Sequence, residues 1–194
     1  MGARQFLRLA LPLSEPLDWA IRGFDCLGED HSDDPVAKNV NGFLTDGRFI
    51  PGLRHDVSAT YLLIDPEARP QIIGYTTLTL DSVRLTNSER KRMEDIGAIG
   101  DFGALRIQMI GIDHRHQGNR YGIALLEGIT GLARKLSEHV AVRFLLADAN
   151  VRKVGWYERA GFVRNQAERE VARLDPERSI SMRLDLLAGL RGES

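Results

Sequence analysis

The sequence has a single cysteine, few aromatic residues and no long hydrophobic run. Cys26 cannot form a disulfide within the chain or a zinc site made of thiolates, so we expect a fold held by packing in a reducing compartment, the cytoplasm. No stretch approaches the roughly 20 apolar residues that a membrane helix needs. Arg8 and Pro12 interrupt the apolar segment 6–13, which also makes it a poor signal peptide. Export and membrane insertion have no support.

The chain also lacks an excess of either charge. Lys and Arg number 26 and Asp and Glu 27, and the resulting net charge of −1 excludes a globally basic nucleic-acid-binding protein, although not a local basic patch. With 43% hydrophobic and 27% charged residues, the composition is that of a globular protein rather than a disordered or coiled-coil chain. A length of 194 residues predicts one domain, residues 1–194.

Hydrophobic periodicity predicts two different halves of the chain. The first half has a strand over 4–11, helices over 17–24 and about 36–44, and a β-hairpin of strands 57–65 and 71–80. A charged helix or loop over 84–95 and a flexible connector over 97–104 precede the strands 105–113, 142–149, 162–165 and 179–186 and the helices 120–137 and 151–160. This alternation predicts a single three-layer α/β/α domain, with a mixed, mostly antiparallel sheet of about six to seven strands.

The segment 110–123, IGIDHRHQGNRYGI, lies where a predicted strand feeds a predicted helix. Backbone N–H groups at a helix start have no intrahelical partner and lie at the positive end of the helix dipole, so a phosphate or diphosphate binds there readily. Gly118 and Gly122 would let the backbone approach such an anion. Further donors stand nearby: Arg115, Gln117 and Arg120. Ordinary turn chemistry also accounts for two glycines, and the segment matches neither a P-loop nor GxGxxG.

A second segment begins at Asn150. Tyr157 follows it by seven residues, which is two helical turns, so both face one side of the predicted helix. Asn150 would be the N-cap with a side chain able to reach a ligand, and Tyr157 would project toward the strand ends. The alternative is that Trp156 and Tyr157 are simply packing aromatics.

Together the two segments resemble the GNAT superfamily of acyl-CoA-dependent N-acetyltransferases. The diphosphate loop of that family reads Gln/Arg-x-x-Gly-x-Gly/Ala, which Gln117 and Gly122 match at the first and last positions. Arg120 stands where the family has glycine. An arginine there still offers its backbone N–H and adds a cation, but it brings a Cβ into the loop.

The later pattern of the family is Asn-x-x-small-x-x-x-Tyr-x-x-x-Gly-Phe. Its matches are Asn150, Tyr157, Gly161 and Phe162, with Lys153 in place of the small residue. The resemblance covers roughly residues 57–186.

The resemblance implies that the strand before the loop splays from its neighbour, so that acyl-CoA pairs with the exposed edge. The backbone of Ile110, Gly111 and Ile112 would align the thioester and polarise its carbonyl. Tyr157 would be the general acid that protonates the departing CoA thiolate. The other implied contacts to acetyl-CoA are Gln117, Gly118, Asn119, Arg120, Tyr121, Gly122, Ile123 and Asn150.

The general base is left open. Asp81, Asp113, His114 and His116 are all conceivable, because family members use a carboxylate, a histidine or a water chain. The His-Arg-His triplet lacks a third ligand, so no metal site is predicted. Cys26 has no basic neighbour in sequence and is interpreted as a buried thiol rather than a nucleophile.

The N-terminal part resembles the GNAT branch that includes toxins acetylating the amino group of aminoacyl-tRNA. The tripeptides that carry this likeness are FDC at 24–26, GFL at 42–44, TYL at 60–62 and GYT at 74–76. Such toxins usually have a strongly basic surface, because phosphate neutralisation supplies most RNA affinity, whereas this chain is nearly neutral, with basic stretches only at 84–92 and 152–173. In this interpretation tRNA and an antitoxin are partners. The resemblance also allows a homodimer.

Three functions follow. The first is an N-acetyltransferase that transfers an acetyl group from acetyl-CoA to a primary amine by direct attack of the amine on the thioester. The second is a toxin-like acetyltransferase acting on aminoacyl-tRNA. The third, suggested by Arg120 and the unassigned base, is an acyl-CoA-binding module without turnover.

Overall fold

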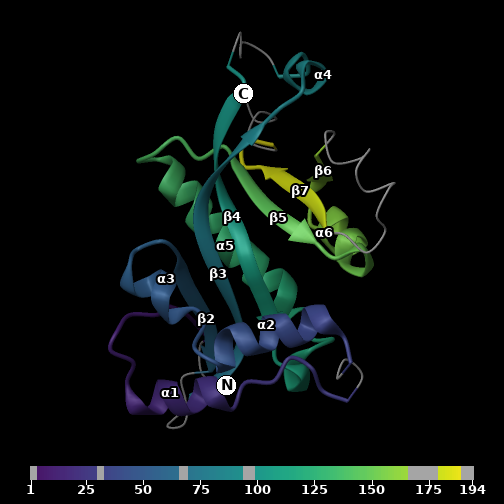
Figure 1. The fold of residues 1–194 in the computed structure, drawn as a ribbon. Helices are drawn as coiled ribbons and strands as arrows, with labels where there is room; N and C mark the ends of the chain where they lie inside the picture. Colours follow the sequence, from purple (N-terminus) through teal and green to yellow (C-terminus); the bar gives the residue numbers. More distant parts are fainter. Residues whose placement is uncertain (1–3, 30–32, 66–69, 94–98, 166–178, 189–194) are drawn as a thin grey trace. The chain divides into compact units, whose positions relative to one another are not determined.

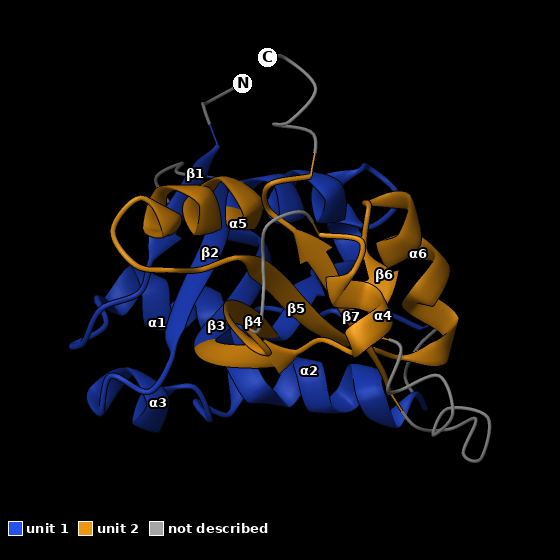
Figure 2. Ribbon diagram, turned by 90° about the horizontal axis from the view of Figure 1, so that it is seen from above, with its two compact units in different colours: residues 1–79, 108–128 blue, residues 80–107, 129–194 orange. Residues whose placement is uncertain are grey.

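Two units, coloured separately in Figure 2, make up the chain in the computed structural model, which describes residues 4–29, 33–65, 70–93, 99–165 and 179–188. The first unit holds residues 1–79 and 108–128, and the second holds 80–107 and 129–194. Three elements run from one unit into the other: β3 (Gln71–Arg84), β4 (Asp101–Ile112) and α5 (Tyr121–Ser137).

The strands that the structure describes form one seven-stranded sheet with the order β1-β2-β3-β4-β5-β7-β6 (Figure 1). Among the strand pairs with a defined register, β4 and β5 are parallel and the others are antiparallel. The predicted mixed, mostly antiparallel α/β sheet is therefore confirmed.

The first unit packs three helices with two neighbouring antiparallel strands. The helices are α1 (Glu15–Arg22), α2 (Pro35–Thr45) and α3 (Ile50–Arg54), and the strands are β1 (Gln5–Arg8) and β2 (Ala59–Asp65). The register that pairs Leu62 with Tyr75 places both side chains out of contact with water. Helix α2 begins at Pro35 because the Asp34 carboxylate accepts hydrogen bonds from the next free backbone amides. The core residues of this unit are Leu9, Ala20, Ile21, Phe24, Cys26, Leu44, Phe49, Leu62, Ile64, Ile72 and Tyr75.

The second unit contains β5 (Phe144–Ala149), β6 (Val163–Arg164), β7 (Ile180–Asp185) and the helices α4 (Asn87–Arg90) and α6 (Val154–Arg159). A short 3-10 turn, η2 (Val151–Lys153), leads from β5 into α6. Helix α4 starts with a capping box between Thr86 and Glu89, and the nearly buried Glu89 carboxylate pairs with Arg183 at 2.8 Å. The core residues of the second unit are Val83, Leu85, Phe102, Ala104, Phe144 and Leu146.

One local expectation needs correction. The connector expected over 97–104 is partly strand, because β4 begins at Asp101 and buries Phe102 and Ala104. In the described part of the segment 84–95, expected as a charged helix or loop, the chain forms the short helix α4, Asn87–Arg90. The short helix α3 has no counterpart among the expected elements. The predicted hairpin turn at 66–69 and the end of the basic stretch 152–173 lie outside the described residues.

Candidate functional site

The predicted diphosphate loop lies between β4 and α5 and belongs to the first unit. After Ile112 the chain makes a 3-10 turn, η1 (His114–His116), whose N-cap is Asp113. The loop continues through Gln117, Gly118, Asn119 and Arg120 to the first residue of α5, Tyr121.

Two residues of this loop, separated by Asn119, have left-handed backbone. Gly118 has φ +76°, and the position that a Cβ would occupy there is open space. Arg120 has φ +63°, a conformation that non-glycine residues adopt only at a cost. Glycine is the residue that takes this conformation without strain. Arg120 is exposed, and no acidic partner for it occurs among the described residues.

The start of α5 leaves donors free for an anion. The backbone amides of Ile123 and Ala124 both donate to the Arg120 carbonyl, at 3.1 and 3.2 Å. The amides of Tyr121 and Gly122 precede these first helical hydrogen bonds, so the helix itself supplies no acceptor for them. With the open backbone at Gly118, the loop presents several N–H groups of the kind that bind phosphate.

The side chains expected to add donors are largely engaged within the protein. The Gln117 amide donates to the carbonyls of Cys26 and Ile112, each at 3.0 Å. The Arg115 guanidinium donates to both carboxylate oxygens of Asp113, each at 2.7 Å. The side-chain nitrogen of Gln117 is therefore already used, which leaves its backbone as the part available to an anion. The positive charge of Arg115 is compensated by the Asp113 carboxylate.

One cation near the loop comes from a distant part of the sequence. The Arg4 guanidinium carbon lies 4.5 Å from the centroid of the Tyr121 ring, and the His116 ring meets the same ring edge-on at 5.7 Å. Arg4 thus adds a positive charge beside the first residue of α5. No sequence signal pointed to Arg4, because this contact depends on where β1 lies in the sheet.

The strand before the loop extends beyond its pairing with β5. The register of β4 with β5 covers Ala104–Ile107 and Phe144–Ala147, while β4 continues through Ile110 and Gly111 to Ile112. The expected separation of this strand from its neighbour requires a strand end of this kind, which continues beyond the paired residues. Gly111 is closely packed within the first unit, since a Cβ there would lie 2.9 Å from Val40 Cγ1 and 3.1 Å from Tyr75 Cε1.

Asn150 and Tyr157 belong to the second unit. Asn150 is the predicted N-cap, but of η2 rather than of a continuous helix, and its Oδ1 accepts from the Arg152 amide at 2.9 Å. The Tyr157 ring is buried against Trp156 and Phe162. Its hydroxyl has no hydrogen-bond partner among the described residues, and it is not among their fully buried unpartnered atoms.

Burial, followed by the negative charge of Asp148, raises the pKa of Tyr157 above its ordinary value. The phenol therefore keeps its proton over the whole neutral range. A protonated phenol can donate a hydrogen bond or a proton.

The two carboxylates considered as general bases are both paired with arginine. Burial would raise the pKa of Asp113, but hydrogen bonds from Arg115 and from backbone amides lower it below its usual value. Burial would likewise raise the pKa of Asp81, but the hydrogen bond from Arg106 lowers it. Arg106 also donates to Asp148 at 2.5 Å. Neither Asp81 nor Asp113 is therefore well suited to accept a proton at neutral pH.

The remaining titratable candidates are engaged in local contacts. His114 Nδ1 lies 3.0 Å from the Asp25 carbonyl oxygen, and His116 Nε2 is buried without a hydrogen-bond partner. Burial raises the pKa of the Cys26 thiol to about 12, which fits the interpretation of a buried thiol. Within the described ranges, no three His, Cys, Asp or Glu side chains gather as metal ligands do. None of the helices described is long and apolar enough to cross a membrane.

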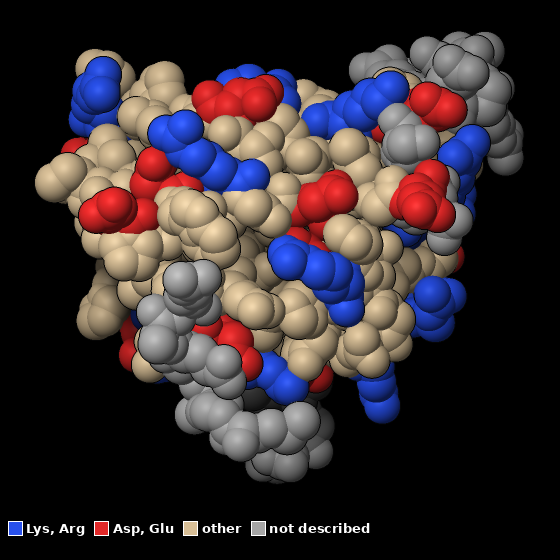
Figure 3. Space-filling view, turned by 90° about the horizontal axis from the view of Figure 1, so that it is seen from below, with Lys and Arg blue, Asp and Glu red and all other residues tan. Residues whose placement is uncertain are grey.

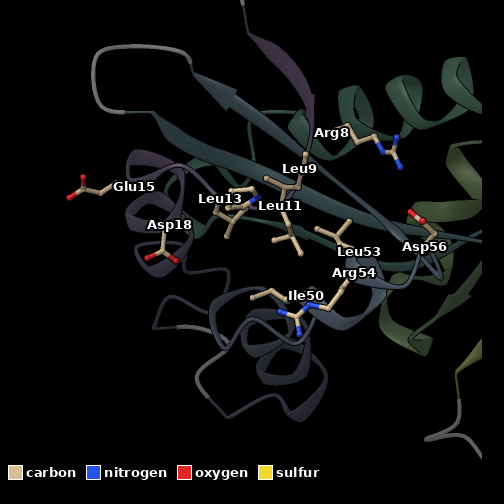
Figure 4. A pocket seen from close by; sticks show the side chains of 12 residues that line it. Arg8, Leu9, Leu11, Leu13, Glu15, Asp18, Ile50, Leu53, Arg54 and Asp56 are labelled. Carbon is tan, nitrogen blue, oxygen red and sulfur yellow. The ribbon is translucent and has the colours of Figure 1, made fainter.

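A cavity of about 1060 Å³ opens elsewhere in the first unit (Figure 4). Its apolar lining comes from Leu9, Leu11, Leu13, Ile50 and Leu53. Charged side chains at its edge are Arg8, Glu15, Asp18, Arg54 and Asp56. The cavity shares no residue with the predicted site.

No protein-family model matches the chain, and no curated protein does. Solved structures do match. A structure described as "Crystal structure of bacterial toxin" is 19% identical, covers 100% of this chain and 98% of its own, and has a TM-score of 0.74. The structure "AtaT complexed with acetyl-methionyl-tRNAfMet" is 18% identical, with coverage of 97% and 98% and a TM-score of 0.73. A third, "Crystal structure of AtaTR bound with AcCoA", is 19% identical, covers 93% of each chain and has a TM-score of 0.67.

The chain has the fold of these toxins. The predicted GNAT-like fold is therefore confirmed, and it extends further than the 57–186 segment on which the resemblance depends. The N-terminal strand and helices belong to the same fold. Sequence identity below one fifth leaves the chemistry to be argued from the residues themselves.

Proposed function

We propose that this chain is an N-acetyltransferase that transfers an acetyl group from acetyl-CoA to a primary amine. The observation that carries the proposal is the loop before α5, in which left-handed Gly118 and Arg120 precede free amides at Tyr121 and Gly122. A buried, protonated phenol at Tyr157 and the toxin-like fold add support.

The residues present fit acetyl-CoA. The open backbone at Gly118 and the unpaired amides at the start of α5 suit a diphosphate, and Arg4 and Arg120 provide positive charge nearby. The β4 backbone at Ile110, Gly111 and Ile112 would hold the thioester arm and donate to its carbonyl oxygen. Bound acetyl-CoA supplies an acetyl group activated as a thioester.

Tyr157 would hold the proton that the leaving sulfur needs. The amine nitrogen forms a bond to the acetyl carbon while the carbon–sulfur bond breaks, and the phenol gives its proton to the sulfur. The proton lost by the amine then restores the phenol through solvent, so the atoms and charges balance. Because its pKa is raised, Tyr157 is protonated whenever the acceptor arrives.

The favoured acceptor is the amino group of an aminoacyl-tRNA. The supporting observation is the similarity along the whole chain to a toxin solved with acetyl-methionyl-tRNA. Basic and acidic side chains are interspersed on the face in Figure 3, so RNA affinity would depend on local cations. Local cations that could bind RNA phosphates are Arg152, Lys153 and Arg159, since no acidic partner for them occurs among the described residues. An antitoxin is the partner that this acceptor implies, by analogy with a similar structure of an AtaT mutant toxin bound to the C-terminus of the antitoxin AtaR.

The test is release of free thiol from acetyl-CoA in the presence of simple amines, peptides and aminoacyl-tRNA. We expect release with aminoacyl-tRNA, and a Tyr157→Phe variant at least about a hundredfold slower with an unchanged Kd for acetyl-CoA. Tyr61→Phe, which removes a hydroxyl from β2, is the matched control and should leave turnover unchanged.

The possible results separate the three functions. Thiol release with small amines alone supports the acetyltransferase and rejects the tRNA acceptor. Binding of acetyl-CoA without release for any acceptor indicates a binding module, and unchanged turnover in Tyr157→Phe removes this residue from the acid role. Growth arrest on expression is the cellular result expected of the toxin.

A further inference from the structure

The connection between α1 and α2 is hydrogen-bonded to the predicted diphosphate loop. Its residues 23–27 contact the segment that follows β4, about ninety positions later in the chain. All of these residues belong to the first unit. Neither segment has a partner suggested by sequence pattern, so only the fold brings them together.

Asp113 is the centre of these contacts. Its side chain has no exposed surface. One oxygen accepts from the backbone amide of Asp25 at 3.1 Å, and the Arg115 guanidinium binds both oxygens. The Arg115 amide donates to the same carboxylate at 3.0 Å, and its guanidinium also reaches the Gly23 carbonyl at 3.3 Å. A buried carboxylate with this many donors fixes the backbone on both sides of it.

Gln117 makes the second link. Its single side-chain nitrogen donates to the carbonyl of Cys26 and to that of Ile112, so it joins the connection to the end of β4. The Cys26 amide in turn donates to Asn41 of α2 at 2.8 Å. The first residue of the loop is thus held from two sides before the chain turns at Gly118.

We infer that Asp113 and Gln117 are positioning residues that fix the diphosphate loop by tying it to residues 23–27. The left-handed backbone at Arg120 is unfavourable for a residue with a Cβ, so it persists only where the chain around it is constrained. The network supplies that constraint at the N-terminal end of the loop. The role of the loop in holding acetyl-CoA rests on the proposed function, whereas its constraint by the network does not.

Two isosteric variants test this inference. Asp113→Asn keeps the shape but loses the carboxylate, and Gln117→Glu keeps the shape but loses both donors. The matched controls are Asp18→Asn, which breaks an exposed ion pair with Arg22 on α1, and Gln71→Glu at the exposed start of β3. The first measurement is hydrogen exchange of the amides of residues 118–123 without ligand, well below the unfolding temperature.

We expect loop exchange about tenfold faster in Asp113→Asn and Gln117→Glu, and within about twofold of wild type in both controls. The Kd for acetyl-CoA should rise by about the same factor, because the loop must then be ordered on binding. Replacing a residue that only stabilises the fold would lower the unfolding temperature and leave loop exchange unchanged. That result in both Asp113→Asn and Gln117→Glu overturns the inference. Faster loop exchange with an unchanged Kd supports the constraint and overturns its part in holding acetyl-CoA. A wild-type chain that does not bind acetyl-CoA refutes the proposed function instead, and loop exchange then decides the constraint alone.

Discussion

The left-handed backbone at Arg120 gives a prediction in which backbone strain opposes the conformational entropy of glycine. At φ +63°, any residue with a Cβ carries a strain of about 1–2 kcal/mol that glycine avoids. Glycine loses about 0.5–1 kcal/mol relative to alanine, because its unfolded chain is freer. Arg120→Gly should therefore be more stable than Arg120→Ala by up to about 1.5 kcal/mol, with a central value of about 0.75 kcal/mol, or about 2–3 °C in Tm for a chain of this size.

Asn119 provides the matched comparison. It is the neighbouring loop residue and has no positive φ, so Asn119→Gly should melt below Asn119→Ala by a similar amount. Thermal unfolding of the four variants, followed by circular dichroism at one pH, measures both differences. If glycine relative to alanine is no more favourable at position 120 than at position 119, Arg120 is not left-handed in solution, and the reasoning about the loop fails.

Three further predictions concern packing and protons. Gly111→Ala should lower the free energy of unfolding, measured by urea titration, by about 1–3 kcal/mol, because the new Cβ would lie 2.9 Å from Val40 Cγ1. An unchanged free energy of unfolding would mean that α2 moves away freely. The pKa of Asp113 is held below its ordinary 3.8, so its contribution to stability is complete above that value and is lost as the pH falls through the lower folded pKa. Urea unfolding at several acidic pH values should show a smaller loss in Asp113→Asn, and parallel curves would contradict this. Because the pKa of Tyr157 is raised, ionisation of this phenol should cause no loss of kcat up to about pH 10. A fall of kcat below that pH in wild type, absent from the pH profile of Tyr157→Phe, would disprove this.

Most elements with strong periodicity could be predicted from the sequence. The helix over 120–137 and the strand over 142–149 are close to α5 and β5, because long runs of buried apolar residues leave little choice of structure. Short elements were less predictable. Helix α3 has only five residues, and the glycine-containing connector became strand from Asp101 because neighbouring strands pair with it.

The candidate site was predictable where motif and backbone coincide. The loop over 117–122 and the N-cap at Asn150 were expected, and both lie at the starts of helical segments. The roles of polar side chains could not be predicted. Arg115 and Gln117 were expected to donate to a ligand, but their side chains donate to Asp113 and to the Cys26 carbonyl instead. Arg4 carried no signal.

The sequence by itself determined the order of elements, the near-neutral charge and the loop whose glycine positions resemble the GNAT pattern. These are properties of neighbouring residues, and local sterics and hydrophobic periodicity are sufficient to produce them. Only the tertiary structure decided that Arg120 takes a left-handed turn, that Tyr157 is buried enough to keep its proton, and that residues 23–27 lie against Asp113. Strain, desolvation and contacts between distant segments arise only once the chain has folded, because each depends on groups that the sequence keeps far apart.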